Sequence, residues 1–82
     1  QTYLEKHDPA KNVARFYRLA VLPNLFGEWT LYREWGRIGQ GSRIRLDCFA
    51  TQEQALAALL ALEARKRQRG YWVEPQQLTL FG

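Results

Sequence analysis

The residues in this sequence best suited to chemistry are arginines and a tryptophan around one glycine-rich turn. The turn spans residues 39–42, and the group on either side of it comprises Arg33, Trp35, Arg37, Arg43 and Arg45. A guanidinium is planar and donates paired hydrogen bonds to a phosphate. An exposed indole offers a flat apolar face to a base or ribose, and such stacking contributes about 1–3 kcal/mol per base. These residue types around one turn predict contact with nucleic acid.

The same residues also fit a less specific interpretation. Trp35 shares its strand parity with Trp29 and Leu31, and that parity by itself favours a core residue. An arginine-rich chain also follows from the codon preference of a GC-rich genome, in which case these cations are solvated surface charges. We expect Trp29 and Trp72 in the core, and Tyr17 and Tyr32 on the outer face of a sheet.

Positive charge is concentrated in the middle of the chain. The 82 residues carry 12 Lys and Arg against 8 Asp and Glu, a net charge of +4. Residues 11–72 alone hold eleven basic side chains against five acidic ones, a sum of +6. A second basic cluster, Arg65, Lys66, Arg67 and Arg69, falls at the end of a predicted helix. Cations there stabilise the negative end of the helix dipole, so helix stabilisation explains this cluster as well as ligand binding does.

Residues for catalysis are scarce. The chain has one histidine, His7, and one cysteine, Cys48, and its carboxylates show no spacing of nucleophile and base. This supply is too small for a disulfide framework or a zinc site. We expect no enzyme, metal, cofactor or small-molecule substrate. His7 is expected to be exposed and Cys48 to be a small core residue.

The chain has neither an apolar run long enough to span a membrane nor a signal-peptide pattern. We therefore expect a cytoplasmic protein that does not act at a membrane. It begins at Gln1 and contains no methionine, which indicates a piece of a longer chain.

Hydrophobic periodicity predicts four strands followed by one helix. The strands are expected at residues 2–8, 13–22, 28–38 and 43–49. In the fourth, Ile44, Leu46 and Cys48 alternate with charged residues, and we expect this apolar set to face inward. Strands that precede a helix without strand–helix alternation indicate an α+β fold. The prediction is a small antiparallel sheet of about four strands with one C-terminal α-helix packed on one face.

The helix has clear start and stop signals. Thr51 is a candidate N-cap, with Gln54 three residues later, and Gly70 follows the last helical residue. Residues 53–69 are mostly alanine, leucine, glutamate, lysine and arginine, which are good helix formers. The expected apolar face comprises Ala55, Leu56, Leu59, Leu60 and Leu62.

The segment Trp35-Gly36-Arg37, continued by Ile38-Gly39-Gln40-Gly41, resembles the WGR domain family, which is named for that tripeptide. Asn12-Val13-Ala14-Arg15-Phe16-Tyr17 is similar to the family's stretch before its second strand, and the alanine-rich helix followed by Trp72 fits as well. The resemblance covers roughly residues 2–75.

The resemblance implies a compact sheet-plus-helix module. In eukaryotic poly(ADP-ribose) polymerases such a module binds DNA at strand breaks and relays the signal to a catalytic domain. Its tryptophan packs against a sugar at the exposed end and its arginine makes polar contacts nearby, roles that fall here on Trp35 and Arg37. Asn12 occupies the place of a family asparagine near the nucleic acid. In bacteria similar domains occur alone or beside unrelated partners.

The end of the chain carries a separate motif. Gln77-Leu78-Thr79-Leu80-Phe81 resembles the peptide by which bacterial replication and repair proteins dock on the sliding clamp. In that role Leu78, Leu80 and Phe81 fill an apolar pocket and Gln77 orients the peptide. The same apolar residues also fit a last strand or a segment that packs on the domain.

These observations predict a WGR-like domain over residues 1–74 and a tail over residues 75–82. The predicted function is a non-catalytic module that binds DNA at ends, nicks or single strands, or RNA, in bacterial DNA repair. The predicted nucleic-acid-binding residues are Trp35, Arg37, Arg43, Arg45, Asn12 and Arg33. The alternative is a protein-interaction or regulatory module that docks on the bacterial sliding clamp through Gln77, Leu78, Leu80 and Phe81.

Overall fold

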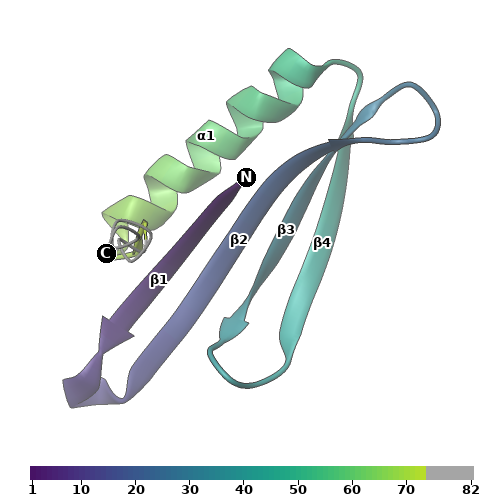
Figure 1. Ribbon diagram of the computed structural model, residues 1–82. Helices are drawn as coiled ribbons and strands as arrows, with labels where there is room; N and C mark the ends of the chain where they lie inside the picture. The colour runs from purple at the N-terminus through teal and green to yellow at the C-terminus, as the bar shows by residue number, and fades with distance from the viewer. Residues whose placement is uncertain (74–82) are drawn as a thin grey trace, which may run out of the picture.

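The computed structural model describes residues 1–73, which form an antiparallel sheet with a helix on one side (Figure 1). The strand order is β4-β3-β2-β1-β5. The elements in chain order are β1 (Thr2–Asp8), the 3-10 helix η1 (Pro9–Lys11), β2 (Val13–Pro23), β3 (Trp29–Arg37), β4 (Ser42–Phe49), α1 (Gln52–Gln68) and β5 (Trp72–Val73). The predicted α+β arrangement of four strands and a helix is confirmed. The additional strand β5 has two residues, too few for hydrophobic periodicity to reveal.

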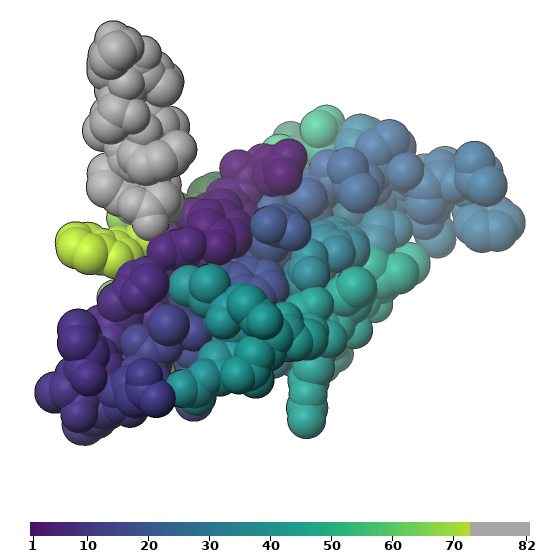
Figure 2. Space-filling model, turned by 60° about the horizontal axis from the view of Figure 1, so that its bottom comes forward, coloured from purple at the N-terminus to yellow at the C-terminus, as the bar shows by residue number. Residues whose placement is uncertain are grey.

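The connection between β2 and β3 forms one end of the molecule and projects from it (Figure 2). The Asn24 side-chain oxygen accepts hydrogen bonds from the backbone N–H groups of Phe26 at 2.8 Å and Glu28 at 3.0 Å. This local bonding is typical of asparagine in turns. The turn leaves Phe26 84% exposed.

Helix α1 begins where the sequence predicts. The Thr51 hydroxyl oxygen accepts a hydrogen bond from the backbone N–H of Gln54 at 3.1 Å, so the predicted N-cap is confirmed. Gly70 has a φ of +96°, a left-handed conformation that glycine adopts without steric cost just beyond a helix end. Ala55 and Leu59 are the buried residues of the helix. Both lie on the predicted apolar face, but Leu56 and Leu60 on that face are exposed.

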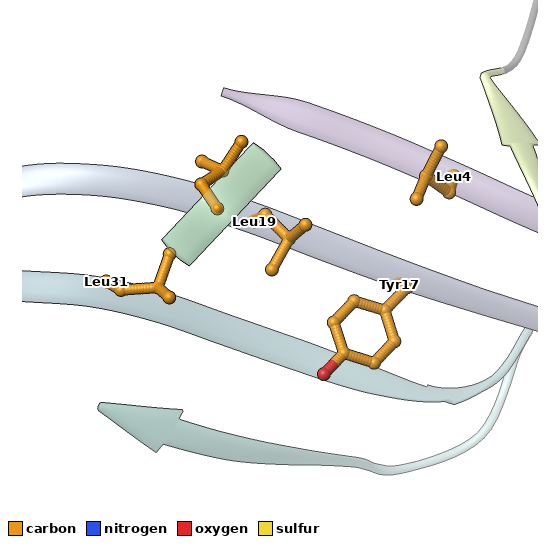
Figure 3. Close-up of a cluster of buried hydrophobic side chains, with 5 residues drawn as sticks. Leu4, Tyr17, Leu19 and Leu31 are labelled. Atoms are coloured by element: carbon orange, nitrogen blue, oxygen red, sulfur yellow. The ribbon is translucent and has the colours of Figure 1, made fainter. Parts of the chain in front are cut away.

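The core is small and lies between α1 and the central strands. Leu4 of β1, Tyr17 and Leu19 of β2, and Leu31 of β3 are buried side by side (Figure 3). Leu59 of α1 completes this cluster. Burial of one leucine side chain contributes about 1.5–3 kcal/mol, so a few contacts carry much of the stability of so small a domain.

The strand register determines which residues lie beneath the helix. Tyr17 pairs with Leu4 on β1 and with Trp35 on β3, and Trp35 pairs with Arg43 on β4. Paired residues of an antiparallel sheet point to the same face. These four side chains therefore form one row across the sheet, on the side that α1 covers. The tripeptide's tryptophan lies in this row, beside the buried Tyr17.

The predicted orientation of β4 is wrong. Ile44 is 57% exposed and Leu46 is 60% exposed on the uncovered face, and Cys48 is also exposed. The alternation itself is real. However, β4 pairs with β3 so that its charged residues fall in the rows of Trp35, Arg33 and Leu31, on the helix side. Alternation defines two faces but does not state which one the helix covers.

The observed burial of two of three aromatic residues differs from that expected from the sequence. Trp72, expected in the core, is 62% exposed because it lies on the short edge strand β5 opposite Glu5. Tyr17, expected on the outer face, is 2% exposed because its register places it under α1. Trp29 is half-buried on the helix side, where it pairs with Phe49. His7 is exposed, as predicted.

Candidate nucleic-acid interface

A concave surface of about 560 Å³ lies where the C-terminal end of α1 meets strands β2, β3 and β4. Its lining combines basic and aromatic side chains with one glycine: Arg15, Tyr17, Trp35, Gly36, Arg37, Arg43, Lys66 and Tyr71. We refer to it as the cleft. Four of these residues are cations and none is acidic, so the cleft concentrates positive charge.

The floor of the cleft is a stacked aromatic pair. The rings of Tyr17 and Trp35 lie 5.5 Å apart between centroids and are 10° from parallel. Tyr71 meets Tyr17 edge-on at 6.3 Å. Tyr17 covers one face of the indole, and the Arg33 guanidinium carbon lies 5.8 Å from the centroid of the Trp35 ring. A ligand can therefore contact only the part of the ring that these two side chains leave open. Trp35 is thus half-buried, since it packs on the core and also forms part of the cleft floor.

Lys66 reaches the cleft from α1. Its Nζ lies 4.4 Å from the centroid of the Tyr17 ring and 5.6 Å from that of Tyr71. Burial lowers the pKa of Lys66 below its ordinary 10.5, and repulsion by nearby cations, foremost Arg69, lowers it further. The fold therefore holds this ammonium on aromatic faces among like charges.

Arg37 links the cleft to the turn between β1 and β2. Its Nη2 donates a hydrogen bond to the Asn12 carbonyl oxygen at 2.7 Å, and the Ile38 N–H donates to the Ala14 carbonyl oxygen at 2.9 Å. Asn12 has a φ of +55°, a left-handed conformation that asparagine tolerates better than most residues. Asn12 thus takes part through its backbone, at a turn that anchors Arg37.

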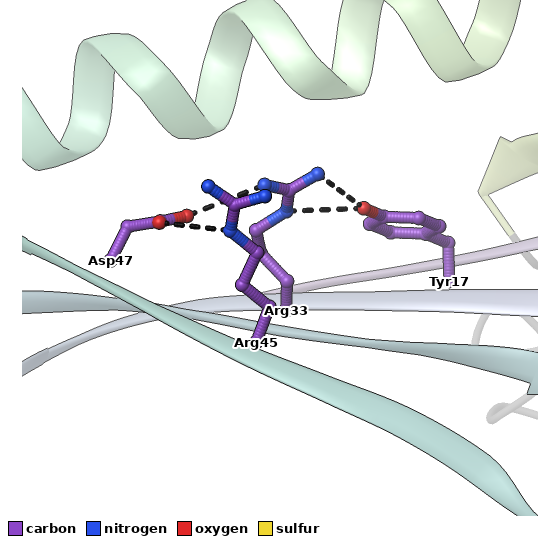
Figure 4. Close-up of polar contacts among 4 residues, drawn as sticks. All are labelled: Tyr17, Arg33, Arg45 and Asp47. Atoms are coloured by element: carbon purple, nitrogen blue, oxygen red, sulfur yellow. Dashed lines mark hydrogen bonds and ion pairs between the residues drawn. The ribbon is translucent and has the colours of Figure 1, made fainter.

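Arg33 is held by contacts within the domain (Figure 4). Its Nε and Nη2 donate to the Tyr17 hydroxyl at 3.2 and 3.0 Å, and its Nη1 donates to Asp47 at 3.3 Å. Arg45 also bonds Asp47, with its Nε at 3.1 Å from the carboxylate. Burial would raise the pKa of Asp47, but the hydrogen bonds from Arg45 and Arg33 outweigh it and lower the pKa. This network fixes the phenol beneath Trp35.

The glycine of the tripeptide is required by the hairpin that carries the cleft residues. A Cβ on Gly36 would lie 2.8 Å from the Gly41 carbonyl oxygen, closer than real Cβ atoms approach. Gly39 has a φ of +83°, a left-handed conformation that glycine adopts without steric cost. The Ser42 hydroxyl donates to Glu34 at 2.8 Å across the hairpin. This bond, followed by that from Tyr32, lowers the pKa of Glu34.

The structure brings together some of the predicted site residues. Trp35, Arg37 and Arg43 line the cleft. Arg33 and Arg45 lie one row away, in the Asp47 network, and Asn12 lies at the turn that Arg37 contacts. The tail residues Gln77, Leu78, Leu80 and Phe81 lie outside the described residues.

Sequence reasoning missed four residues that line the cleft: Arg15, Tyr17, Lys66 and Tyr71. Arg15 and Tyr17 stand in the stretch that resembles the family, so their place could have been inferred from it. Lys66 belongs to the basic cluster already noted, but only the tertiary contact of α1 with the sheet separates it from its neighbours. Nothing in the local sequence marks Tyr71.

The described part of the chain shows little other site chemistry. Within residues 1–73, no three His, Cys, Asp or Glu side chains gather closely enough to hold a metal ion. None of the helices in that range has the length and apolar character needed to cross a membrane.

Comparison with known proteins agrees with the motif. The sequence model of the WGR domain matches residues 1–77. An uncharacterized protein, y4dW, of Sinorhizobium fredii is 42% identical over 73 residues. That match covers 89% of this chain and 36% of the relative, so the chain spans about a third of that protein's length. No solved structure matches. The chain belongs to the WGR domain family, small domains that are generally nucleic-acid-binding and usually non-catalytic.

Proposed function

We propose that this domain binds DNA at ends, nicks or single strands through the cleft, without catalysing a reaction. In this role the open part of the Trp35 ring packs against a base or sugar, and Arg15, Arg37, Arg43 and Lys66 contact phosphates. RNA is a second form of the same ligand, because stacking and phosphate contacts do not separate the two sugars. Arg45 and Arg33 act indirectly, since their bonds to Asp47 and Tyr17 position the aromatic floor.

One observation carries the proposal: four cations surround a stacked aromatic pair in a hollow with no acidic lining residue. The cation Arg43 and the indole of Trp35 are cross-strand neighbours, so a phosphate and a base of the same strand can be contacted together. The match of the chain to a generally nucleic-acid-binding family supports the same ligand class. We further propose that it acts in the bacterial cytoplasm, in DNA maintenance.

The test is a titration of the purified chain with four labelled ligands at two salt concentrations. These are single-stranded DNA, nicked duplex, blunt duplex and single-stranded RNA. Four phosphate contacts predict that the logarithm of affinity for a single strand falls with the logarithm of salt with a slope of about −3. The ligand with the highest affinity identifies the preferred DNA structure.

The matched variants distinguish the cleft from general positive charge. Arg37→Gln/Arg43→Gln removes two cleft cations, whereas Arg18→Gln/Arg67→Gln removes two cations paired elsewhere with Glu34 and Glu63. We expect the cleft variant to bind single-stranded DNA roughly tenfold more weakly than the control near 0.2 M salt. Equal affinity of the two double variants would refute the cleft as the binding site.

A second candidate function rests on the tail motif alone. We propose that Gln77-Leu78-Thr79-Leu80-Phe81 docks on the bacterial sliding clamp while the domain binds DNA. Titration of purified clamp with the full chain and with Leu80→Ala/Phe81→Ala tests this. Loss of binding in the variant supports docking, and unchanged binding excludes it. DNA affinity should be the same in both chains, since the cleft lies within residues 1–73.

A further inference from the structure

A second hollow of about 210 Å³ lies between β3 and the C-terminal turns of α1. Its lining is one apolar side chain and four cations: Leu62, Arg33, Arg65, Lys66 and Arg69. We refer to it as the groove. Lys66 lines both the groove and the cleft, so the two hollows meet at its side chain. The positive surface is therefore continuous from the row of Trp35 to the end of α1.

Of the four groove cations, only Arg33 has a carboxylate counter-ion among the described residues, Asp47 at 3.3 Å. Among residues 1–73, no carboxylate lies within ion-pairing distance of Arg65, Lys66 or Arg69. Arg67, on the same helix, pairs with Glu63 at 2.9 Å. The helix-dipole explanation applies to all four basic residues equally. It does not account for three of them sharing a hollow while the fourth is neutralised.

The position of Lys66 shows that the fold crowds like charges here. The side chain is half-buried, and the cations that depress its pKa include Arg69, Arg33, Arg65 and Lys6. Such crowding is unfavourable in the free protein and is relieved when an anion binds between the charges. A phosphate seated in the groove would neutralise Arg65 and Arg69 and reduce the repulsion on Lys66.

We propose that the groove is a second phosphate subsite, occupied by the same strand that enters the cleft. The ligand is then a single strand of several nucleotides, which stacks on Trp35, passes Lys66 and places a further phosphate between Arg65 and Arg69. This inference rests on the proposed function and adds the path and minimum length of the ligand. A dinucleotide with one phosphate cannot occupy both hollows.

Three double variants and two DNA ligands test the path. Arg65→Gln/Arg69→Gln changes the groove, Arg37→Gln/Arg43→Gln changes the cleft, and Arg18→Gln/Arg67→Gln is the control. Glutamine keeps a good helix propensity, and thermal unfolding shows that each variant is folded. The ligands are a hexanucleotide and a dinucleotide, titrated by fluorescence anisotropy over a range of salt concentrations.

We expect the groove variant to bind the hexanucleotide roughly threefold more weakly than the control near 0.2 M salt, with a salt slope shallower by about 0.7, because one phosphate contact is lost. Its affinity for the dinucleotide should equal that of the control. The cleft variant should lose affinity for both ligands.

The opposite outcomes separate the two proposals. If the cleft variant binds both ligands more weakly while the groove variant has the same affinities as the control, only the second subsite is overturned. If the groove variant loses as much affinity for the dinucleotide as for the hexanucleotide, the two hollows are one site and the proposed path is wrong. If the wild-type chain binds neither ligand, or the cleft variant matches the control, the proposed function itself fails.

Discussion

Replacing Gly36 by alanine should destabilise the hairpin that carries the cleft residues. The added Cβ would lie 2.8 Å from the Gly41 carbonyl oxygen and 3.1 Å from the Ser42 Cα. Both are backbone atoms, so no side chain can rotate away to make room. The strands must separate locally, which moves the turn between Arg37 and Arg43.

The expected magnitude follows from this overlap. Forcing a methyl group into a packed position costs about 1–3 kcal/mol, and 1 kcal/mol shifts the Tm of a domain this size by about 4–8 °C. Gly41→Ala is the matched control, because its Cβ would meet nothing within 4 Å and its φ is not positive. That change restricts the unfolded chain and should stabilise the domain by about 0.4–1 kcal/mol.

Thermal unfolding followed by circular dichroism measures both variants. We expect Gly36→Ala to unfold well below the wild type and Gly41→Ala to unfold at or above it. DNA affinity should fall only in Gly36→Ala, since its neighbours Trp35 and Arg37 are displaced. If the two variants have the same Tm, the close approach of the hairpin is not what requires glycine at this position.

Other predictions concern binding and pH. Trp35→Leu keeps an apolar side chain against Tyr17 but removes the flat ring, so single-stranded DNA should bind roughly tenfold more weakly. Anisotropy measures this affinity, and an unchanged value would exclude stacking. Affinity for an adenine oligonucleotide should fall as the pH rises through the pKa of Lys66, which lies below its ordinary 10.5. Lys66→Arg should move this loss of affinity to higher pH. If the wild type and Lys66→Arg show the same dependence of affinity on pH, the charge of Lys66 has no role in binding. The fold lowers the pKa of Asp47, so its ionised carboxylate stabilises the folded state at pH values above the ordinary pKa of 3.8. This stabilisation is lost as the pH falls through the lowered pKa of the folded state. Asp47→Asn should therefore be less stable than the wild type at neutral pH, with the gap closing in acid; urea unfolding at several pH values measures it, and a constant gap would contradict the assignment.

Much of the fold could be predicted because its signals are local. Thr51 caps the helix, Gly70 follows it, and glycines mark the hairpin, since each of these residue types meets a backbone requirement at its own position. The order of strands β1 to β4 also follows, because short connections join neighbours in an antiparallel sheet. The family motif also indicates that Trp35 and Arg37 lie in the same hairpin.

The composition of the cleft could not be predicted in the same way. Lys66 and Tyr71 follow the hairpin by roughly thirty residues and reach Tyr17 only because α1 packs back across β2 and β3. Arg33 has the same residue type as Arg43, yet bonds to Tyr17 and Asp47 hold it inside the domain. Such assignments depend on long-range neighbours, which no local pattern contains.

The amino-acid sequence alone determined strands β1 to β4 and helix α1, each limit to within one residue, together with the charge and the hairpin in which a tryptophan and arginines gather. Only the tertiary structure decided which face of the sheet is buried. One face of β4 carries Ile44 and Leu46, and the other carries charged residues. The single helix covers the charged face, so Ile44 and Leu46 are exposed while Arg43 lies beside Trp35. The physical reason is that alternation with period two separates a strand's side chains into two sets, whereas burial depends on what packs against each set.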